Sequence, residues 1–176
     1  SRGLGDVYKR QELENILNNT DNNPGIVLVP AFTGLGAPHW SPNARASISG
    51  LTRDSNRNEI ILSSIQSISL QSLDLISALE NDTSHLFNSS IKTLKVDGGV
   101  TENEWFLQNL SDICNLNIMK SYEKEATALG AASLSALGSG EINDLSEFNK
   151  TSKENSIFFP KIKNNLREKI INNWDN

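Results

Sequence analysis

Apolar residues recur at helical spacing through the middle of the chain and predict one long helix over residues 56–80. Six of them lie on one broad face, and Leu62 and Leu75 widen it. The six are Ile61, Ile65, Ile68, Leu73, Ile76 and Leu79. Asn56, with Glu59 three residues later, resembles a capping box that has asparagine in place of serine or threonine. A helix of about 25 residues is long for a globular domain, so we expect burial along much of its length.

Shorter patterns on either side predict further helices and strands. We expect helices at 12–19, 103–115, 125–137 and 161–174, and strands at 25–30, 47–51, 91–96 and 116–120. Residues 31–47 and 141–160 are expected to be loops, the first of them rich in glycine and proline. Helices that alternate with short strands indicate the α/β class.

Composition limits the classes of function. The 176 residues suit one domain or a large piece of one, and the net charge of −5 gives no support for nucleic-acid binding. The single cysteine, Cys114, falls at an apolar helix position, which indicates a core residue in a reducing compartment. No uninterrupted apolar run approaches the roughly 18 residues of a membrane span, and no signal peptide is recognisable. We therefore expect a cytoplasmic protein that binds neither nucleic acid nor membrane.

The first eleven residues differ in character from the rest. Residues 1–11 resemble translated adapter sequence, such as occurs at the ends of assembled reads, so we expect a non-native extension there. The native domain is then expected over residues 12–175. Because the chain does not begin with methionine, we expect it to be the tail of a longer protein.

One stretch combines a strand, a glycine turn and the start of a helix. Leu94 and Val96 suit a buried strand, and Gly98 and Gly99 interrupt the pattern before Asn103 and an amphipathic run. This arrangement points backbone N–H groups at an anion, and glycine allows a ligand to come close to the main chain. A nucleotide-phosphate site and an ordinary turn both explain it, and these residues alone favour the ordinary turn.

Two further segments allow a structural and a functional interpretation. The loop at 31–40 packs two glycines, a proline and two aromatic residues into ten positions. Local chemistry favours a rigid structural loop with Trp40 as a packing anchor over the wall of a ligand cleft. The helix at 125–137 is dense in alanine and glycine, which we expect to serve helix packing, and Glu125 suits its N-terminus. His39 and His85 are too far apart in sequence to indicate a metal site.

Taken together, these motifs resemble those of the glycerol kinases, a branch of the sugar and polyol kinases built on the actin-like ATPase (ribonuclease H-like) fold. The resemblance covers nearly all of the chain after residue 11. It rests on the segment Pro30–Trp40, on Gly50-Leu51-Thr52-Arg53, on Asp97-Gly98-Gly99 with Asn103, and on Glu125–Ala132. The related xylulose kinases tend to have a charged version of the first segment. Four motifs at compatible spacing make the resemblance specific.

The resemblance implies the C-terminal half of a two-domain kinase, incomplete at its N-terminus, that transfers phosphate from ATP to glycerol with Mg²⁺. It implies that the backbone of Gly99 meets the nucleotide, that Gly98 lies beside it in the turn, and that Asn103 contacts the nucleotide. The general base would lie upstream, so no catalytic residue and no metal ligand is assigned to this chain. Glycerol would be held mainly by the N-terminal domain, and the full-length enzyme is expected to form a homo-oligomer. The present chain is expected to be inactive alone.

Some positions depart from the family pattern and leave alternatives open. Gln66 stands where glutamate is usual, Ala46 where glycine is commoner, and Val100 where alanine is usual, while Glu104-Trp105 replaces a milder pair. None removes a catalytic group. A kinase of another polyol or sugar in the same family remains an alternative. A non-catalytic actin-like module that binds nucleotide or a partner is the alternative from another class.

Overall fold

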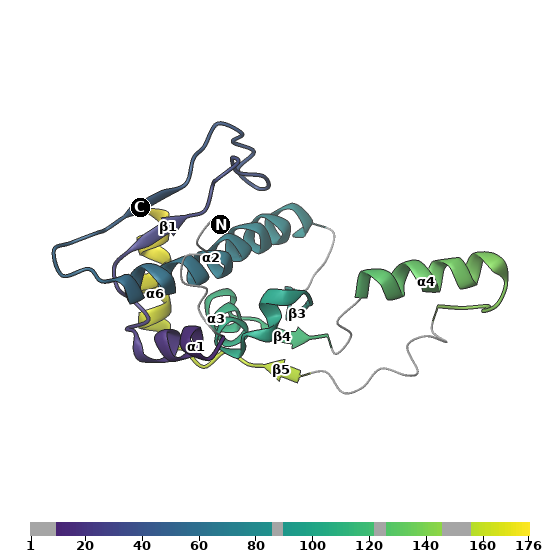
Figure 1. Ribbon diagram of the computed structural model, residues 1–176. Coiled ribbons are helices and arrows are strands. Elements are labelled where there is room, and N and C mark those ends of the chain that lie inside the picture. The colour runs from purple at the N-terminus through teal and green to yellow at the C-terminus, as the bar shows by residue number, and fades with distance from the viewer. Residues whose placement is uncertain (1–9, 86–89, 122–125, 146–155) are drawn as a thin grey trace, which may run out of the picture.

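The computed structural model describes residues 10–85, 90–121, 126–145 and 156–176, and within them helices alternate with strands (Figure 1). The mixed content confirms the α/β class predicted from the sequence. In chain order the elements are α1 (Arg10–Asn19), β1 (Val27–Val29), β2 (Ser47–Ser49), α2 (Arg57–Thr83), β3 (Thr93–Val96), the 3₁₀ helix η1 (Gly99–Glu102), α3 (Glu104–Cys114), β4 (Asn117–Lys120), α4 (Ala126–Ser139), β5 (Ser156–Phe158) and α6 (Asn164–Asp175). Helix α1 begins two residues before the boundary expected at residue 12.

A three-stranded sheet of order β3-β4-β5 carries the second half of the fold. Strands β3 and β4 are parallel, with Val96 opposite Lys120, and α3 makes the crossover between them. Strand β5 is antiparallel to β4, with Phe158 opposite Ile118. The expectation that residues 141–160 form only a loop is therefore wrong at β5. Its apolar run is very short, and it becomes a strand because β4 provides a partner.

Strands β1 and β2 form a separate antiparallel ribbon, with Val27 opposite Ser49. The β1 residues are half-buried and the β2 residues exposed, so a fully buried strand at 25–30 is not what forms. Burial is concentrated in the residues that flank β1, because Ile26 and Ala31 are 4% and 0% exposed. Ser63 of α2 donates its hydroxyl to the carbonyl of Ile26 at 3.0 Å, which ties the ribbon to the long helix.

The capping box predicted at the start of α2 is confirmed. Asn56 Oδ1 accepts the backbone N–H groups of Asn58 and Glu59 at 2.9 and 3.2 Å, and Glu59 Oε2 accepts the backbone N–H of Asn56 at 2.9 Å. These bonds satisfy donors that the first helical turn leaves free, which typically stabilises a helix by about 1 kcal/mol. Helix α2 therefore begins where the sequence predicts, although it continues three residues further, to Thr83.

The face of α2 that packs is only partly the predicted one. Leu62 and Ile76 are buried as expected, but Ile68, Leu75 and Leu79 are 37%, 49% and 49% exposed. The buried face instead includes three serines and a glutamine; its members are Leu62, Ser63, Gln66, Ser67, Ser69, Leu70 and Ile76. Apolar side chains lie all round this helix, so the spacing alone does not decide which face meets α3. Small serines on the chosen face let the two helices approach closely.

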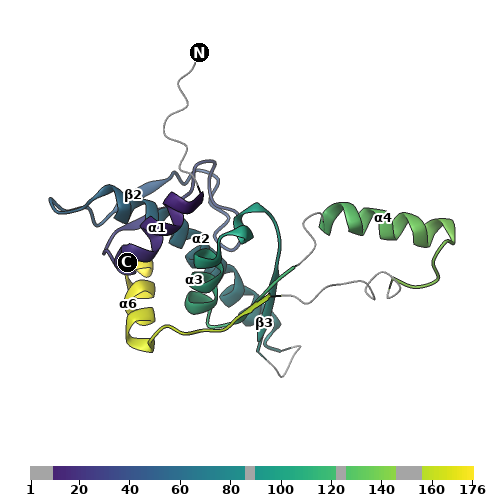
Figure 2. The same ribbon diagram turned by 60° about the horizontal axis from the view of Figure 1, so that its bottom comes forward.

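Helix α3 lies at the centre of the core. One cluster packs it against α2 and the sheet, and a second packs its C-terminal end against α6. The first contains Ile76, Phe106, Leu107, Leu110, Cys114, Leu116 and Ile118, and the second contains Leu70, Ile113 and Ile170. Figure 2 shows α3 between α2, α6 and the sheet. This packing holds the N-terminus of α3, and the turn before it, in a fixed place.

Helix α4 lies apart from the other elements in both views (Figures 1 and 2). From Thr127 to Ser139 its residues are exposed, except Ser133 and Ala136. Leu134, for example, is 63% exposed. The expectation that its small residues pack closely against a neighbouring backbone is therefore not met within the part of the chain that is described. Glu125, assigned to the start of this helix from the sequence, lies outside the described residues.

Among the described residues, α2 is the one helix that is long and apolar enough to cross a membrane, judged by length and composition. The sequence expectation concerned uninterrupted apolar runs, and serine, glutamine and aspartate residues interrupt the apolar residues of α2. In the fold, however, α2 packs along α3, α1 and β1. Ser63, Gln66 and Ser67 on its buried face make hydrogen bonds inside the domain, such as that from Gln66 Nε2 to the carbonyl of Asn22 at 3.1 Å. These contacts are those of a core helix of this domain.

Candidate functional site

The candidate site lies where β3 and β4 end. Because the two strands are parallel, their carboxyl ends meet at one edge of the sheet, where α/β folds generally bind ligands. The backbone N–H of Ser121 donates to the carbonyl of Val96 at 2.9 Å, which continues the pairing one residue beyond β4. The segment that follows β3, Asp97 to Asn103, is therefore held at this edge by the sheet on one side and by α3 on the other.

The glycine turn is built differently from the predicted strand, turn and helix. Gly98 has φ 95° and ψ 170°, and a 3₁₀ turn, η1, lies between it and α3. The backbone N–H and the hydroxyl of Thr101 both donate to the carbonyl of Gly98, at 3.0 and 2.7 Å. The helix follows the glycines near the predicted residue, and the 3₁₀ turn η1, which the sequence did not indicate, lies between them. Thr101, which is 4% exposed, is the residue that closes the turn, and the sequence pattern did not indicate it.

Asn103 is the N-cap of α3 and not a residue of its first turn. Its Oδ1 accepts the backbone N–H of Phe106 at 2.9 Å. A carboxamide has both an acceptor oxygen and an NH₂ donor group. With the oxygen engaged by the helix, the NH₂ group is the part of Asn103 that can donate to a ligand. The capping bond also fixes the direction in which this group points.

The turn is open on the side of its glycines. A Cβ built on Gly98 or on Gly99 would meet no heavy atom within 4 Å. The positive φ of Gly98 is nevertheless costly for any residue with a side chain. Gly99 has no such restriction, so its lack of a side chain serves only to leave space in front of the backbone. The structure brings Gly98, Gly99 and Asn103 together in one turn, in which the two glycines are exposed and Asn103 is half-buried.

An ion pair lies beside this turn. Lys120 Nζ is 3.2 Å from Oε1 of Glu102, which is the last residue of η1. Sequence reasoning missed both residues. A signal was present for Lys120, because it is the last residue of a predicted strand and its side chain must lie near the carboxyl edge. Glu102 carried no signal, since its place depends on η1.

A second concave region lies between the loop at 30–39 and the exposed face of α2. It is a cavity of about 380 Å³ whose lining includes His39, Ile68, Asp74 and Leu75. His39 Nε2 lies 3.1 Å from Oδ2 of Asp74, so the loop and α2 contact each other where both line the cavity. No residue of the glycine turn lines it. The loop therefore forms one wall of this cavity, and its role as the wall of a ligand site stays a prediction.

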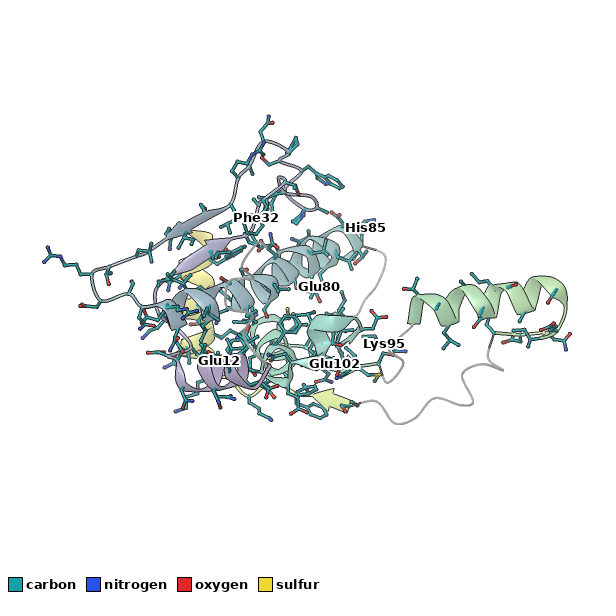
Figure 3. All side chains as sticks on the ribbon, in the orientation of Figure 1. Glu12, Phe32, Glu80, His85, Lys95 and Glu102 are labelled. Atoms are coloured by element: carbon teal, nitrogen blue, oxygen red, sulfur yellow. The ribbon has the colours of Figure 1, made fainter. Side chains whose placement is uncertain are left out.

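Trp40 does not serve as the packing anchor of that loop. Trp40 is 75% exposed, and its backbone φ of 48° is unusual for a residue with a bulky side chain. Phe32, the other aromatic residue of the loop, is 74% exposed; Figure 3 labels it on the upper part of the molecule. The loop keeps its shape mainly by backbone hydrogen bonds, such as the bond from the N–H of Leu35 to the carbonyl of Ser41 at 2.8 Å.

Cys114 is a core residue, as predicted, and not a nucleophile. It lies in the first apolar cluster and is 6% exposed. Burial raises the pKa of its thiol from 9.0 to about 12, against a smaller lowering by the charge of Arg167. The thiolate that reacts is therefore almost absent at neutral pH.

The chain matches the C-terminal domain of the FGGY family of carbohydrate kinases over residues 4–139. It belongs to this family. The match begins inside the segment 1–11, so the boundary expected at residue 12 stays a prediction. The actin-like ATPase fold expected from the motifs is the fold that its relatives of known structure share with it.

The relatives include named enzymes. A glycerol kinase from Coxiella burnetii (strain Dugway) is 39% identical over 168 residues, which are 96% of this chain and 32% of that protein. The crystal structure of Plasmodium falciparum glycerol kinase with ADP matches 95% of this chain and 33% of its own, with 33% identity and a TM-score of 0.79. A gluconate kinase from Lactobacillus acidophilus has a TM-score of 0.77 at 23% identity, which shows the fold alone. The chain thus spans about a third of the length of the curated relatives it matches.

Proposed function

We propose that this chain is the nucleotide-binding, C-terminal portion of an ATP-dependent glycerol kinase, which converts glycerol to glycerol 3-phosphate. The observation that carries the proposal is the open turn from Gly98 to Asn103 at the carboxyl edge of the parallel strands. The 39% identity to a glycerol kinase over 168 residues supports the choice of substrate. The glycine-rich loop of residues 34–38, which resembles the glycerol kinase form, supports it too.

In this proposal the residues of the turn bind and orient the nucleotide. Gly99 lets the phosphate or sugar of ATP approach the main chain, and Gly98 provides the positive φ that turns the backbone toward it. Asn103 donates its NH₂ group while its oxygen caps α3. ATP, when bound, supplies the phosphoryl group, and Mg²⁺ neutralises its charge. Catalysis of this kind depends mainly on positioning, which suits a turn fixed by a sheet and a buried helix.

The donor set of this domain suits a nucleotide better than a separate protein-bound metal. Within the described residues, His, Cys, Asp and Glu form no group of three that would hold an ion. Mg²⁺ commonly binds through phosphates, waters and one or two carboxylates, so it would arrive with ATP. Glycerol would be bound mainly by a preceding domain, and this C-terminal portion would be inactive alone. We propose a cytoplasmic homo-oligomer for the whole enzyme.

The test is ATP-dependent phosphorylation by the intact kinase, meaning the longer protein whose C-terminal portion this chain would form. Glycerol, gluconate and xylulose should be compared as acceptors, with Asn103→Ala and Gly99→Val as variants. We expect turnover on glycerol, and a raised KM for ATP or lost turnover in both variants. Turnover on another acceptor would keep the nucleotide site and change the substrate. Absence of both ATP binding and turnover would leave only a non-catalytic module.

A further inference from the structure

The ion pair between Glu102 and Lys120 joins the glycine turn to strand β4. Lys120 ends β4, and Glu102 ends η1, 18 residues earlier in the chain. The two side chains are only 24% and 28% exposed, so solvent and salt screen the pair less than a pair at the open surface. The contact therefore restrains the far end of the glycine turn against the neighbouring strand.

The hydrogen bonds from Thr101 and Asn103 do not link the turn to β4. Both bonds from Thr101 return to Gly98, and the N–H of Asn103 donates to the carbonyl of Val100 at 3.2 Å, so they act within the turn. They shape the turn, which chain connectivity joins to β3 and to α3, whereas the ion pair joins its last residue to β4. Glu102 ends η1 immediately before Asn103, and Figure 3 labels it near the ends of β3 and β4. Its contact with Lys120 is thus next in sequence to the side chain that would donate to the nucleotide.

We propose that Lys120, acting through Glu102, is a positioning residue for the nucleotide turn. This inference rests on the proposed nucleotide site and adds a residue that the family motifs of this chain do not include. Loss of the ion pair leaves the groups of the turn and their links to β3 and α3, but removes the side-chain link to β4, so Gly99 and Asn103 are held less tightly. Small displacements of binding groups weaken binding appreciably, so the effect falls on ATP affinity.

A direct role for Lys120 predicts a different pattern. If its ammonium met a phosphate, Glu102 would compete with the nucleotide for that charge. Removal of the carboxylate would then strengthen ATP binding, whereas removal of the lysine would weaken it. Under the positioning role, both removals weaken binding by a similar factor. The sign of the effect at Glu102 therefore separates the two roles.

The experiment uses the intact kinase and compares K120M, E102Q, K120M/E102Q, the reversed pair K120E/E102K and the conservative K120R. We expect each single variant, K120R excepted, to raise the KM and Kd for ATP about two- to five-fold, the range of a partly exposed ion pair. The kcat and the KM for glycerol should change little. The double removal should cost less than the sum of the two single removals, because both break the same contact. The reversed pair and K120R should recover most of the affinity.

Three results would overturn the proposal. Unchanged KM and Kd for ATP in K120M and E102Q would show that the ion pair does not position any group that binds the nucleotide, even if the melting temperature falls. Tighter ATP binding in E102Q would assign Lys120 a direct contact instead. A wild-type enzyme without ATP binding would remove the proposed function itself, and this inference with it. Hydrogen exchange at the amides of Thr101 and Asn103 should rise in both single removals and provides a readout independent of turnover.

Discussion

Asp74 on α2 accepts the indole N–H of Trp174 on α6 through both of its carboxylate oxygens, at 3.0 and 3.2 Å. The same carboxylate meets His39 at 3.1 Å. One side chain of the long helix therefore joins the last helix of the chain to the loop that lines the cavity. The Asp74 side chain is 17% exposed and that of His39 47%, so the bond to Trp174 is the better protected contact.

Replacement of Trp174 by phenylalanine should destabilise the domain. The Trp174→Phe variant keeps an aromatic ring but removes the donor, and a largely buried carboxylate loses a hydrogen bond worth about 1.5–3 kcal/mol. His39→Asn, whose lost contact is more exposed, should cost well under 1 kcal/mol. Urea unfolding of the intact kinase, followed by circular dichroism, measures both. Equal costs for the two variants would contradict the assignment of Asp74 chiefly to Trp174.

Local signals in the sequence predicted the elements whose causes are local. The capping box of Asn56 and Glu59 places the start of α2, and Asn103 begins α3, because each bond there joins residues two or three apart. The place of the glycine turn was predicted for the same reason, whereas the nucleotide-binding roles of Gly99 and Asn103 came from the family resemblance and stay predictions. The 3₁₀ turn η1 inside the glycine turn was not predicted. It depends on the bonds from Thr101 to Gly98, and no sequence pattern distinguishes Thr101 from other loop threonines.

Features that depend on distant partners were not predictable. Strand β5 forms because β4 lies beside it, and the pair Asp74 and Trp174 are 100 residues apart. The packing face of α2 was misjudged because its apolar residues surround the helix, so that α3 and the ribbon decide which side is buried. The Glu102–Lys120 contact requires both η1 and the parallel pairing of β3 with β4. Each of these needs tertiary contacts that periodicity does not encode.

The two glycines of the turn should respond in opposite ways to alanine. Gly98→Ala places a Cβ on a residue with φ 95°, which should cost about 1–2 kcal/mol of stability. Gly99→Ala meets open space and has no positive φ, so stability should be unchanged or slightly raised. If the nucleotide approaches Gly99, however, this variant should lose ATP affinity while remaining fully folded. Thermal unfolding and ATP titration of the same samples test both halves.

A contrary pattern would be informative at each glycine. Loss of stability in Gly99→Ala would show that the space before the backbone is filled by another part of the intact protein. Undiminished ATP affinity in a folded Gly99→Ala variant would remove Gly99 from the nucleotide site and leave the turn as a structural feature.

Substitutions at Asn103 can separate its capping role from a role in binding. Asn103→Ala removes both the cap and the NH₂ donor, so we expect a loss of about 1 kcal/mol in stability together with a raised KM for ATP. Asn103→Asp keeps an oxygen that caps Phe106 but has no NH₂ group, so stability should be close to that of the wild type. If the NH₂ group donates to the nucleotide, Asn103→Asp should still raise the KM for ATP, and by at least as much as alanine, because its charge repels phosphate.

Asn103→Ser serves as the neutral control for that series. Serine is also a good N-cap, and it removes the NH₂ group without adding a charge. A stable Asn103→Ser variant with the KM of the wild type would show that Asn103 acts only as a cap. A stable variant with a raised KM would assign the donor to the nucleotide site.

The thiol of Cys114 should make stability fall in alkaline solution. Its pKa is raised by burial from 9.0 in the unfolded chain to about 12 in the fold, so the folded state holds the proton more tightly. Below pH 9 both states are protonated, and the thiol adds no pH dependence. Between pH 9 and 12 only the unfolded state ionises, so the free energy of unfolding should decline by up to about 1.4 kcal/mol per pH unit from this group.

The Cys114→Ala variant should lose this part of the decline in the free energy of unfolding. Urea unfolding at pH 8, 9 and 10 would measure it, and parallel curves for the wild type and the variant would contradict burial of the thiol.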